Sequence, residues 1–138
     1  MASLTESNIV FIGGGVMAEA FIRGILARGL ACPERITVSE PLPPRREYLT
    51  ANLGVRVIDD NAAAARLADI IVLAVKPQAA AVALAPLNGA LSPSALVISI
   101  MAGVRLATIE RLVGSPAIVR AMPNTPAQIG EGVSAWAS

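Results

Sequence analysis

The chain has 138 residues, a formal net charge of +1, one cysteine and no histidine. This length suits one domain, and the large share of hydrophobic residues, few of them aromatic, suits an α/β protein with a buried parallel sheet. The scattered arginines exclude a basic face for nucleic acid. The lack of histidine excludes a Ser-His-Asp triad and removes the usual zinc ligands, so we expect no metal site.

The first residues and the cysteine content indicate where the protein works. The first seven residues are polar and include Glu6, which is unlike a secretory signal, and the apolar runs are too short to cross a bilayer. A single cysteine, Cys32, cannot form an intrachain disulfide. We therefore expect a soluble cytoplasmic protein without a membrane partner.

The most informative local pattern is an apolar run at 9–12 followed by G-G-G-V-M-A at 13–18. A strand, a G-x-G-x-x-A turn and a helix together are typical of dinucleotide binding. In this pattern Gly13 allows a sharp exit from the strand, Gly15 lets the backbone approach a pyrophosphate, and Ala18 lets helix and strand pack closely. Amides at the start of the helix would face the phosphates. A glycine triplet also occurs in ordinary strand-to-helix turns, so the motif needs support from the rest of the chain.

Strands and helices alternate along the remaining sequence. We expect further strands at 36–39, 55–58, 70–75, 95–99 and 117–121, and a late strand at 132–137. We expect helices at 45–52, beginning at Pro43 and Pro44 and closed by Gly54, then a short helix with Asn61 as N-cap, and helices at 78–85 and 106–112. This order predicts right-handed crossovers and a doubly wound, mostly parallel sheet of Rossmann type in one domain, residues 1–138.

Ligands of such sheets bind beyond the carboxyl ends of the strands, so the residues just after each strand are candidate site residues. These segments are 13–18, 39–41, 75–78 and 101–103, with 122–126 after the sixth strand. Lys76 is the only lysine in the chain and directly follows the most apolar strand, where it could contact an anionic ligand. A solvated lysine at a strand end is the alternative interpretation.

Asn124 lies between Pro123 and Pro126, which restrict the backbone on either side of it. A side-chain amide held in one direction would be useful beside a reacting ring. Taken alone, the segment is explained at least as well by a plain proline-rich turn.

Three charged residues bear on the choice of dinucleotide. Glu40 ends the second strand, where an acidic side chain accepts hydrogen bonds from the adenosine ribose of NAD. Arg45 and Arg46 follow at the start of the next helix and could attract the extra phosphate of NADP, or could simply be a solvated pair. The sequence therefore leaves NAD and NADP open.

Four segments together carry a resemblance to a known family. They are I-G-G-G-V-M-A at 12–18, A-V-K-P-Q at 74–78, S-I-M-A-G-V at 99–104 and R-A-M-P-N-T-P-A at 120–127. With these segments the chain resembles pyrroline-5-carboxylate reductase, the last enzyme of proline biosynthesis, from about residue 9 to its end. The M-P-N-T-P segment is far more specific than the glycine turn.

The resemblance implies roles for individual residues. It places Gly13, Gly14, Gly15, Val16 and Met17 around the pyrophosphate, Asn61 near the adenosine, Val75, Lys76 and Ala102 near the nicotinamide half, and Asn124 close to the reacting ring. Glu40 differs from the small polar residue often found at its position in the family, and Arg45 and Arg46 could compensate.

The resemblance also implies an activity and an organisation. We expect the cofactor-binding part of a reductase that transfers hydride from NADH or NADPH to the C=N bond of 1-pyrroline-5-carboxylate, giving L-proline. The family's helical C-terminal domain, which supplies the dimer interface and most of the substrate pocket, is not in this chain. The full-length protein is expected to be a homo-oligomer, and this chain alone to turn over poorly. The alternatives are a β-hydroxyacid-dehydrogenase-like domain and a nucleotide-binding module without catalysis.

Overall fold

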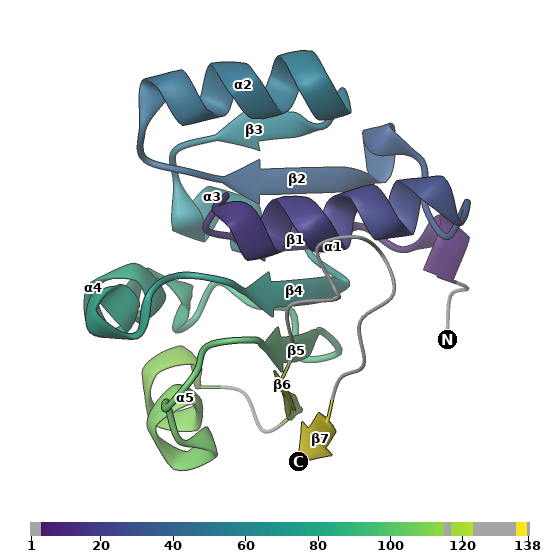
Figure 1. Cartoon of the computed structure of the whole chain (residues 1–138). Coiled ribbons are helices and arrows are strands. Elements are labelled where there is room, and N and C mark those ends of the chain that lie inside the picture. The colour runs from purple at the N-terminus through teal and green to yellow at the C-terminus, as the bar shows by residue number, and fades with distance from the viewer. Residues whose placement is uncertain (1–3, 115–116, 123–134, 138) are drawn as a thin grey trace.

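The apolar runs of the sequence form one sheet of seven strands in the order β3-β2-β1-β4-β5-β6-β7 (Figure 1). The computed structural model describes residues 4–114, 117–122 and 135–137. The strands are β1 Ile9–Ile12, β2 Ile36–Ser39, β3 Arg56–Ile58, β4 Ile70–Leu73, β5 Leu96–Ser99, β6 Ile118–Met122 and β7 Ala135–Ala137. β1 to β6 are parallel, and β7 pairs with β6 in the antiparallel direction. The predicted doubly wound, mostly parallel sheet is confirmed.

Helices connect the strands. The α-helices are α1 Val16–Ala27, α2 Pro43–Leu53, α3 Asn61–Arg66, α4 Ala80–Leu84 and α5 Leu106–Val113. Short 3-10 turns are η1 Leu4–Glu6, η2 Pro33–Arg35, η3 Pro77–Ala79 and η4 Ala85–Leu87. None of the helices in the described part of the chain is both long and apolar enough to span a membrane.

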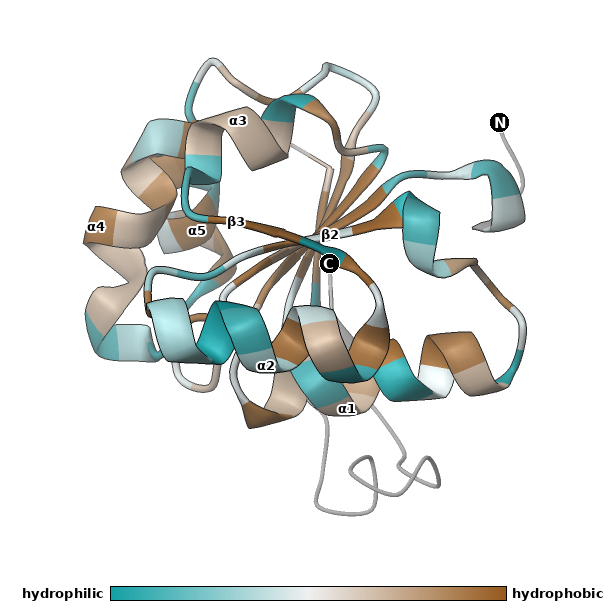
Figure 2. Cartoon of the chain, turned by 90° about the horizontal axis from the view of Figure 1, so that it is seen from above, coloured by the Kyte–Doolittle hydropathy of each residue, from teal (hydrophilic) through white to brown (hydrophobic). Residues whose placement is uncertain are grey.

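The alternation of side chains along the strands divides the core into two layers. Ile9 and Phe11 of β1 point to the face covered by α1 and α2, whereas Val10 and Ile12 point to the face covered by α3, α4 and α5. Figure 2 shows the sheet edge-on between these two helix layers. Because β1 is completely buried on both faces, its residues form an unbroken apolar run.

The strand order reverses at β1, and this reversal creates the opening used by the site. Ile9 pairs with Ile36 of β2 on one side and with Ile70 of β4 on the other. The connections after β1 and β4 therefore leave the sheet toward opposite helix layers. In open α/β sheets, ligands bind in the crevice at such a switch point.

The structure corrects three element boundaries. The strand expected at 70–75 ends at Leu73, because Ala74 makes the last ladder bond, to the Ile12 carbonyl, and Pro77 starts a 3-10 turn. The helix expected at 78–85 is shorter, because α4 lies between two 3-10 turns. Of the predicted late strand, the described residues form β7, and residues 132–134 lie outside the described part of the chain.

The sequence suggested Asn61 as the N-cap of α3, and this prediction is wrong. Asp60 takes that position, since its Oδ1 accepts a hydrogen bond of 2.9 Å from the Ala63 amide. Asn61 is the first residue of the helix, and its side chain donates to the Ala83 carbonyl of α4.

Candidate dinucleotide site

The first two residues of the turn after β1 must be glycine for different reasons. Gly13 has φ +97°, and a Cβ there would lie 2.9 Å from the Ala74 carbonyl oxygen, so both its conformation and its packing require glycine. A Cβ at Gly14 would lie 2.6 Å from a methyl carbon of Leu49. The sharp exit predicted at Gly13 is confirmed, and Gly14 is needed for the approach of α2.

Gly15 and the start of α1 suit an anion. Gly15 is the N-cap of α1, with φ −79°, and a Cβ there would meet no atom within 4 Å among the described residues. No described side chain caps the first turn of this 12-residue helix. Unpaired amides at a helix start are suitable donors to a phosphate, so this part of the turn fits a pyrophosphate.

Glu40 fixes the glycine turn from the end of β2. Its side chain is buried, Oε1 accepts a hydrogen bond of 2.9 Å from the Gly14 amide, and Oε2 accepts one of 3.0 Å from the Leu42 amide. Glu40 therefore occupies the Gly14 amide with a negative charge. This leaves the following amides, those of Gly15, Val16 and Met17, as the candidate donors to a pyrophosphate.

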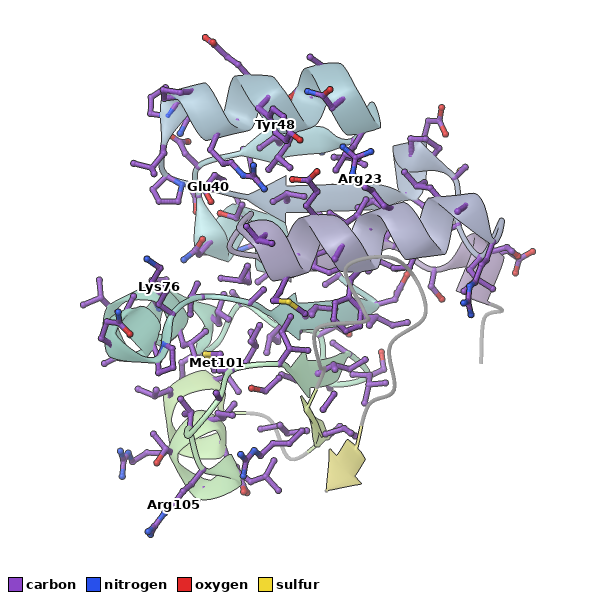
Figure 3. All side chains as sticks on the ribbon, viewed as in Figure 1. Arg23, Glu40, Tyr48, Lys76, Met101 and Arg105 are labelled. Carbon is purple, nitrogen blue, oxygen red and sulfur yellow. The ribbon has the colours of Figure 1, made fainter. Side chains whose placement is uncertain are left out.

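Arg45 lies on the other side of Gly14. Its Nε donates to the Gly14 carbonyl at 2.6 Å, its Nη2 donates to Glu19 Oε1 at 2.8 Å, and its guanidinium lies 4.8 Å from the centre of the Tyr48 ring. The side chain is thereby held between α1 and α2. Figure 3 shows Tyr48 and Arg23 in this region, whereas Glu40 and Lys76 lie at the carboxyl end of the sheet.

Glu19 is the centre of this network. It accepts hydrogen bonds from Arg23 at 2.9 Å, from Arg45 at 2.8 Å and from the Tyr48 hydroxyl at 3.0 Å. Partial burial of Glu19 acts to raise its pKa, but the hydrogen bonds from the arginines and from Tyr48 outweigh it, so the pKa lies below its usual value. The carboxylate thus ties the first turns of both helices together.

Arg46 braces the segment after β2. Its Nη1 donates to the carbonyl oxygens of Glu40 at 2.9 Å and Pro41 at 2.8 Å, and lies 4.0 Å from Asp59 Oδ2. Like Arg45, it is therefore committed to backbone carbonyls and a carboxylate rather than to open space.

A cavity of about 570 Å³ lies beside these residues, at the carboxyl ends of β1 to β4. Its walls are mainly apolar, with polar groups at one end, and its lining residues are Gly13, Ser39, Pro41, Asp59, Asp60, Asn61, Val75, Ala79, Val82, Ala83 and Pro86. A mainly apolar cleft with a few polar groups at the switch point fits an adenosine half.

Asn61 is locked in this cavity by two hydrogen bonds. The buried Ser39 hydroxyl donates to its Oδ1 at 2.5 Å, and its Nδ2 donates to the Ala83 carbonyl at 2.9 Å. The structure therefore joins the ends of β2, α3 and α4 through one amide.

The residues predicted for the nicotinamide half are only partly brought together. Val75 lines the cavity, while Lys76 and Ala102 are exposed outside it, each beyond its strand at the same edge. A second hollow of about 510 Å³, between α4 and the turn before α5, is lined by Pro77 and Gly103 among others. Asn124 lies outside the described residues.

The sequence reasoning missed Asp59, Asp60 and Val82. The two aspartates directly follow β3, so the rule that selects residues after each strand would have found them. Val82 carried no such signal, because a valine on a short helix is usually buried, yet here it is 84% exposed at the cavity.

Comparisons with known proteins agree with this architecture. The family described as NADP oxidoreductase, coenzyme F420-dependent, matches residues 8–103. A pyrroline-5-carboxylate reductase of Synechocystis is 48% identical over 127 residues, covering 92% of this chain and 47% of that protein.

Two solved structures are similar to this chain. The pyrroline-5-carboxylate reductase of Coxiella burnetii has a TM-score of 0.87 and 39% identity, covering 94% of this chain and 48% of that one. The Plasmodium falciparum enzyme, solved with NADP bound, has a TM-score of 0.84 and 34% identity, covering 98% and 49%. The chain spans about half the length of these relatives. It belongs to the NADP oxidoreductase, coenzyme F420-dependent family.

Proposed function

We propose that this chain is the dinucleotide-binding part of a reductase that forms L-proline from 1-pyrroline-5-carboxylate. The observation that carries the proposal is the combination, at one switch point, of the open Gly15 turn at the start of α1 with the 570 Å³ cavity. The resemblance of the segments at 74–78, 99–104 and 120–127 supports the substrate assignment.

Each residue has a role in this proposal. The amides of Gly15, Val16 and Met17 hold the pyrophosphate, and Glu40 and Arg45 keep the turn in the shape that exposes them. Asn61 lies beside the adenosine, and Val75, Lys76 and Ala102 border the nicotinamide. Asn124 is proposed to orient the reacting ring.

The bound dinucleotide would supply the hydride for reduction of the C=N bond. The task of this chain is to bind and orient it, because orientation of reacting groups removes much of the entropic barrier. The substrate carboxylate and the imine proton are proposed to be handled mainly by a helical C-terminal domain of the kind found in the family. The whole protein is proposed to be a cytoplasmic homo-oligomer.

Binding of the cofactor is tested by isothermal titration of this chain with NADH and with NADPH. At least one of them is expected to bind, and binding of neither would overturn the proposal. Proline formation by the chain alone is expected to fall far below that of a full-length reductase.

The substrate assignment is tested with a chimera in which this chain replaces the corresponding half of the Synechocystis reductase. The chimera is expected to reduce pyrroline-5-carboxylate and not to oxidise short β-hydroxy acids. A folded chimera that binds the dinucleotide but does not reduce pyrroline-5-carboxylate would contradict the assignment, because the Synechocystis half supplies most of the substrate pocket and this chain supplies the orientation of the hydride.

A further inference from the structure

The charges around the adenosine end of the cavity point to one choice between the two dinucleotides. We propose that Glu40, Asp59 and Asp60 make this chain select NADH over NADPH by repelling the 2′-phosphate. The inference rests on the proposed function, because it concerns the specificity of the same site.

Glu40 cannot turn away from the site. Both of its carboxylate oxygens are fixed by backbone amides, at 2.9 Å from Gly14 and 3.0 Å from Leu42, and only 7% of the residue is exposed. A carboxylate at the end of the second strand accepts hydrogen bonds from ribose hydroxyls, whereas a phosphate on the same ribose would meet it as a like charge.

The arginines that could offset this charge are wholly or partly committed to other partners. Arg45 is bound to Glu19 and to the Gly14 carbonyl, and it does not line the cavity. Arg46 uses Nη1 for the carbonyls of Glu40 and Pro41. Side-on binding of a phosphate by Nε and Nη2 of Arg45 would require its hydrogen bonds to break, whereas Arg46 is held through Nη1 alone and is only partly committed.

Two further carboxylates lie at the cavity itself. Asp59 and Asp60 line it, and among its described lining residues there is no lysine or arginine. Asp60 is fixed as the cap of α3, and Asp59 Oδ2 lies 4.0 Å from Arg46 Nη1. A phosphate monoester carries nearly two negative charges at neutral pH, so the 2′-phosphate would be repelled by three carboxylates, with the partly committed guanidinium of Arg46 beside Asp59 as the opposing charge.

The experiment is a titration of the chain with NADH and NADPH at low and at high salt. NADH is expected to bind about tenfold more tightly or better at low salt, and the ratio is expected to narrow at high salt, because salt screens exposed charges. Equal or tighter binding of NADPH would overturn the inference and leave the proposed function intact. Binding of neither would overturn both.

The double variant Asp59→Asn, Asp60→Asn tests the cause. Asparagine also caps helices well, so α3 is expected to persist, and NADPH is expected to bind about tenfold more tightly than to the parent chain while NADH changes little. Glu34→Gln is the control at a distant place, since it removes one negative charge in η2, before the amino end of β2, where the double variant removes two at the cavity. An unchanged NADPH affinity in a folded double variant, or an equal gain in the control, would overturn the inference.

Discussion

A hydrogen bond of 2.9 Å from the Gly14 amide to Glu40 Oε1 joins the glycine turn after β1 to the end of β2. Arg45 holds the Gly14 carbonyl at 2.6 Å, so both backbone groups of this glycine are bound by side chains from the β2–α2 segment. The shape of the turn is therefore set by residues that lie 26 and 31 positions later in the chain. The predictions below test how far stability and binding depend on this arrangement.

Gly13→Ala and Gly15→Ala are expected to separate folding from binding. The first places a Cβ 2.9 Å from a carbonyl oxygen at φ +97°, so it should lower the free energy of unfolding by about 3 kcal/mol. The second places a Cβ in open space, so it should cost less than about 1 kcal/mol but weaken dinucleotide binding about tenfold. Urea unfolding and calorimetric titration measure the two effects. A Gly15→Ala variant with full affinity would contradict the proposed pyrophosphate site.

The Glu19–Arg45 pair is expected to couple α1 and α2. Both side chains are largely buried, at 16% and 25% exposed, and they meet at 2.8 Å. A double-mutant cycle with Glu19→Gln and Arg45→Met should give a coupling of about 1 kcal/mol in the free energy of unfolding. The pair with the more exposed Arg23 should couple less, because solvent screens it. Equal coupling in both cycles would contradict this ranking.

The stabilising effect of Glu19 is expected to depend on pH in one direction. Its pKa is lower in the folded chain than in the unfolded one, so its contribution is complete above the unfolded value, near 4.5. The contribution is lost as the pH falls through the folded value. Urea midpoints of the parent chain and of Glu19→Gln should therefore differ at pH 7 and converge toward pH 3. A difference between the two urea midpoints that stays constant from pH 7 to pH 3 would show that the charge of the Glu19 carboxylate does not cause the stabilisation.

Asn61→Ala is expected to destabilise the chain by leaving the Ser39 hydroxyl and the Ala83 carbonyl without this partner. The cost should be about 1–2 kcal/mol in the free energy of unfolding, because Ser39 is buried. Adding Ser39→Ala should recover part of the lost free energy of unfolding, since the buried hydroxyl that has lost its partner is then removed. Chemical unfolding of the two variants provides the measurement. A double variant less stable than Asn61→Ala would contradict the explanation.

Most of the fold could be predicted because its signals are local. The apolar runs of β1 and β4 and the glycine turn define the layers and the switch point, and Gly54 closes α2 as expected. The helix after β4 was predicted too long, because an alanine-rich segment favours a helix while Pro77 and Pro86 divide it into 3-10 and α segments. Where a helix ends depends on whether its backbone forms 3-10 or α hydrogen bonds. The spacing of apolar residues along the sequence does not show this.

The site was predictable only as a set of positions along one sheet edge. The sequence could not show whether Glu40 or the two arginines determine the choice between NAD and NADP. That choice depends on which partner each guanidinium binds in space. Arg45 binds the Gly14 carbonyl, and Arg46 binds those of Glu40 and Pro41. Every residue carries a backbone carbonyl, so the sequence does not show which carbonyl an arginine side chain binds.

The central place of β1 has a consequence for how the chain folds during synthesis. β1 leaves the ribosome before the other described strands, yet its neighbour β4 begins only at Ile70, and Asn8 and Asp69, which bracket the pair, are 61 residues apart. Such distant pairings slow folding, because a long loop must close before the contact forms. Until β4 has been made, β1 exposes one unpaired apolar edge. A ribosomal stall before Leu73 would therefore release a chain prone to aggregate through its first strand.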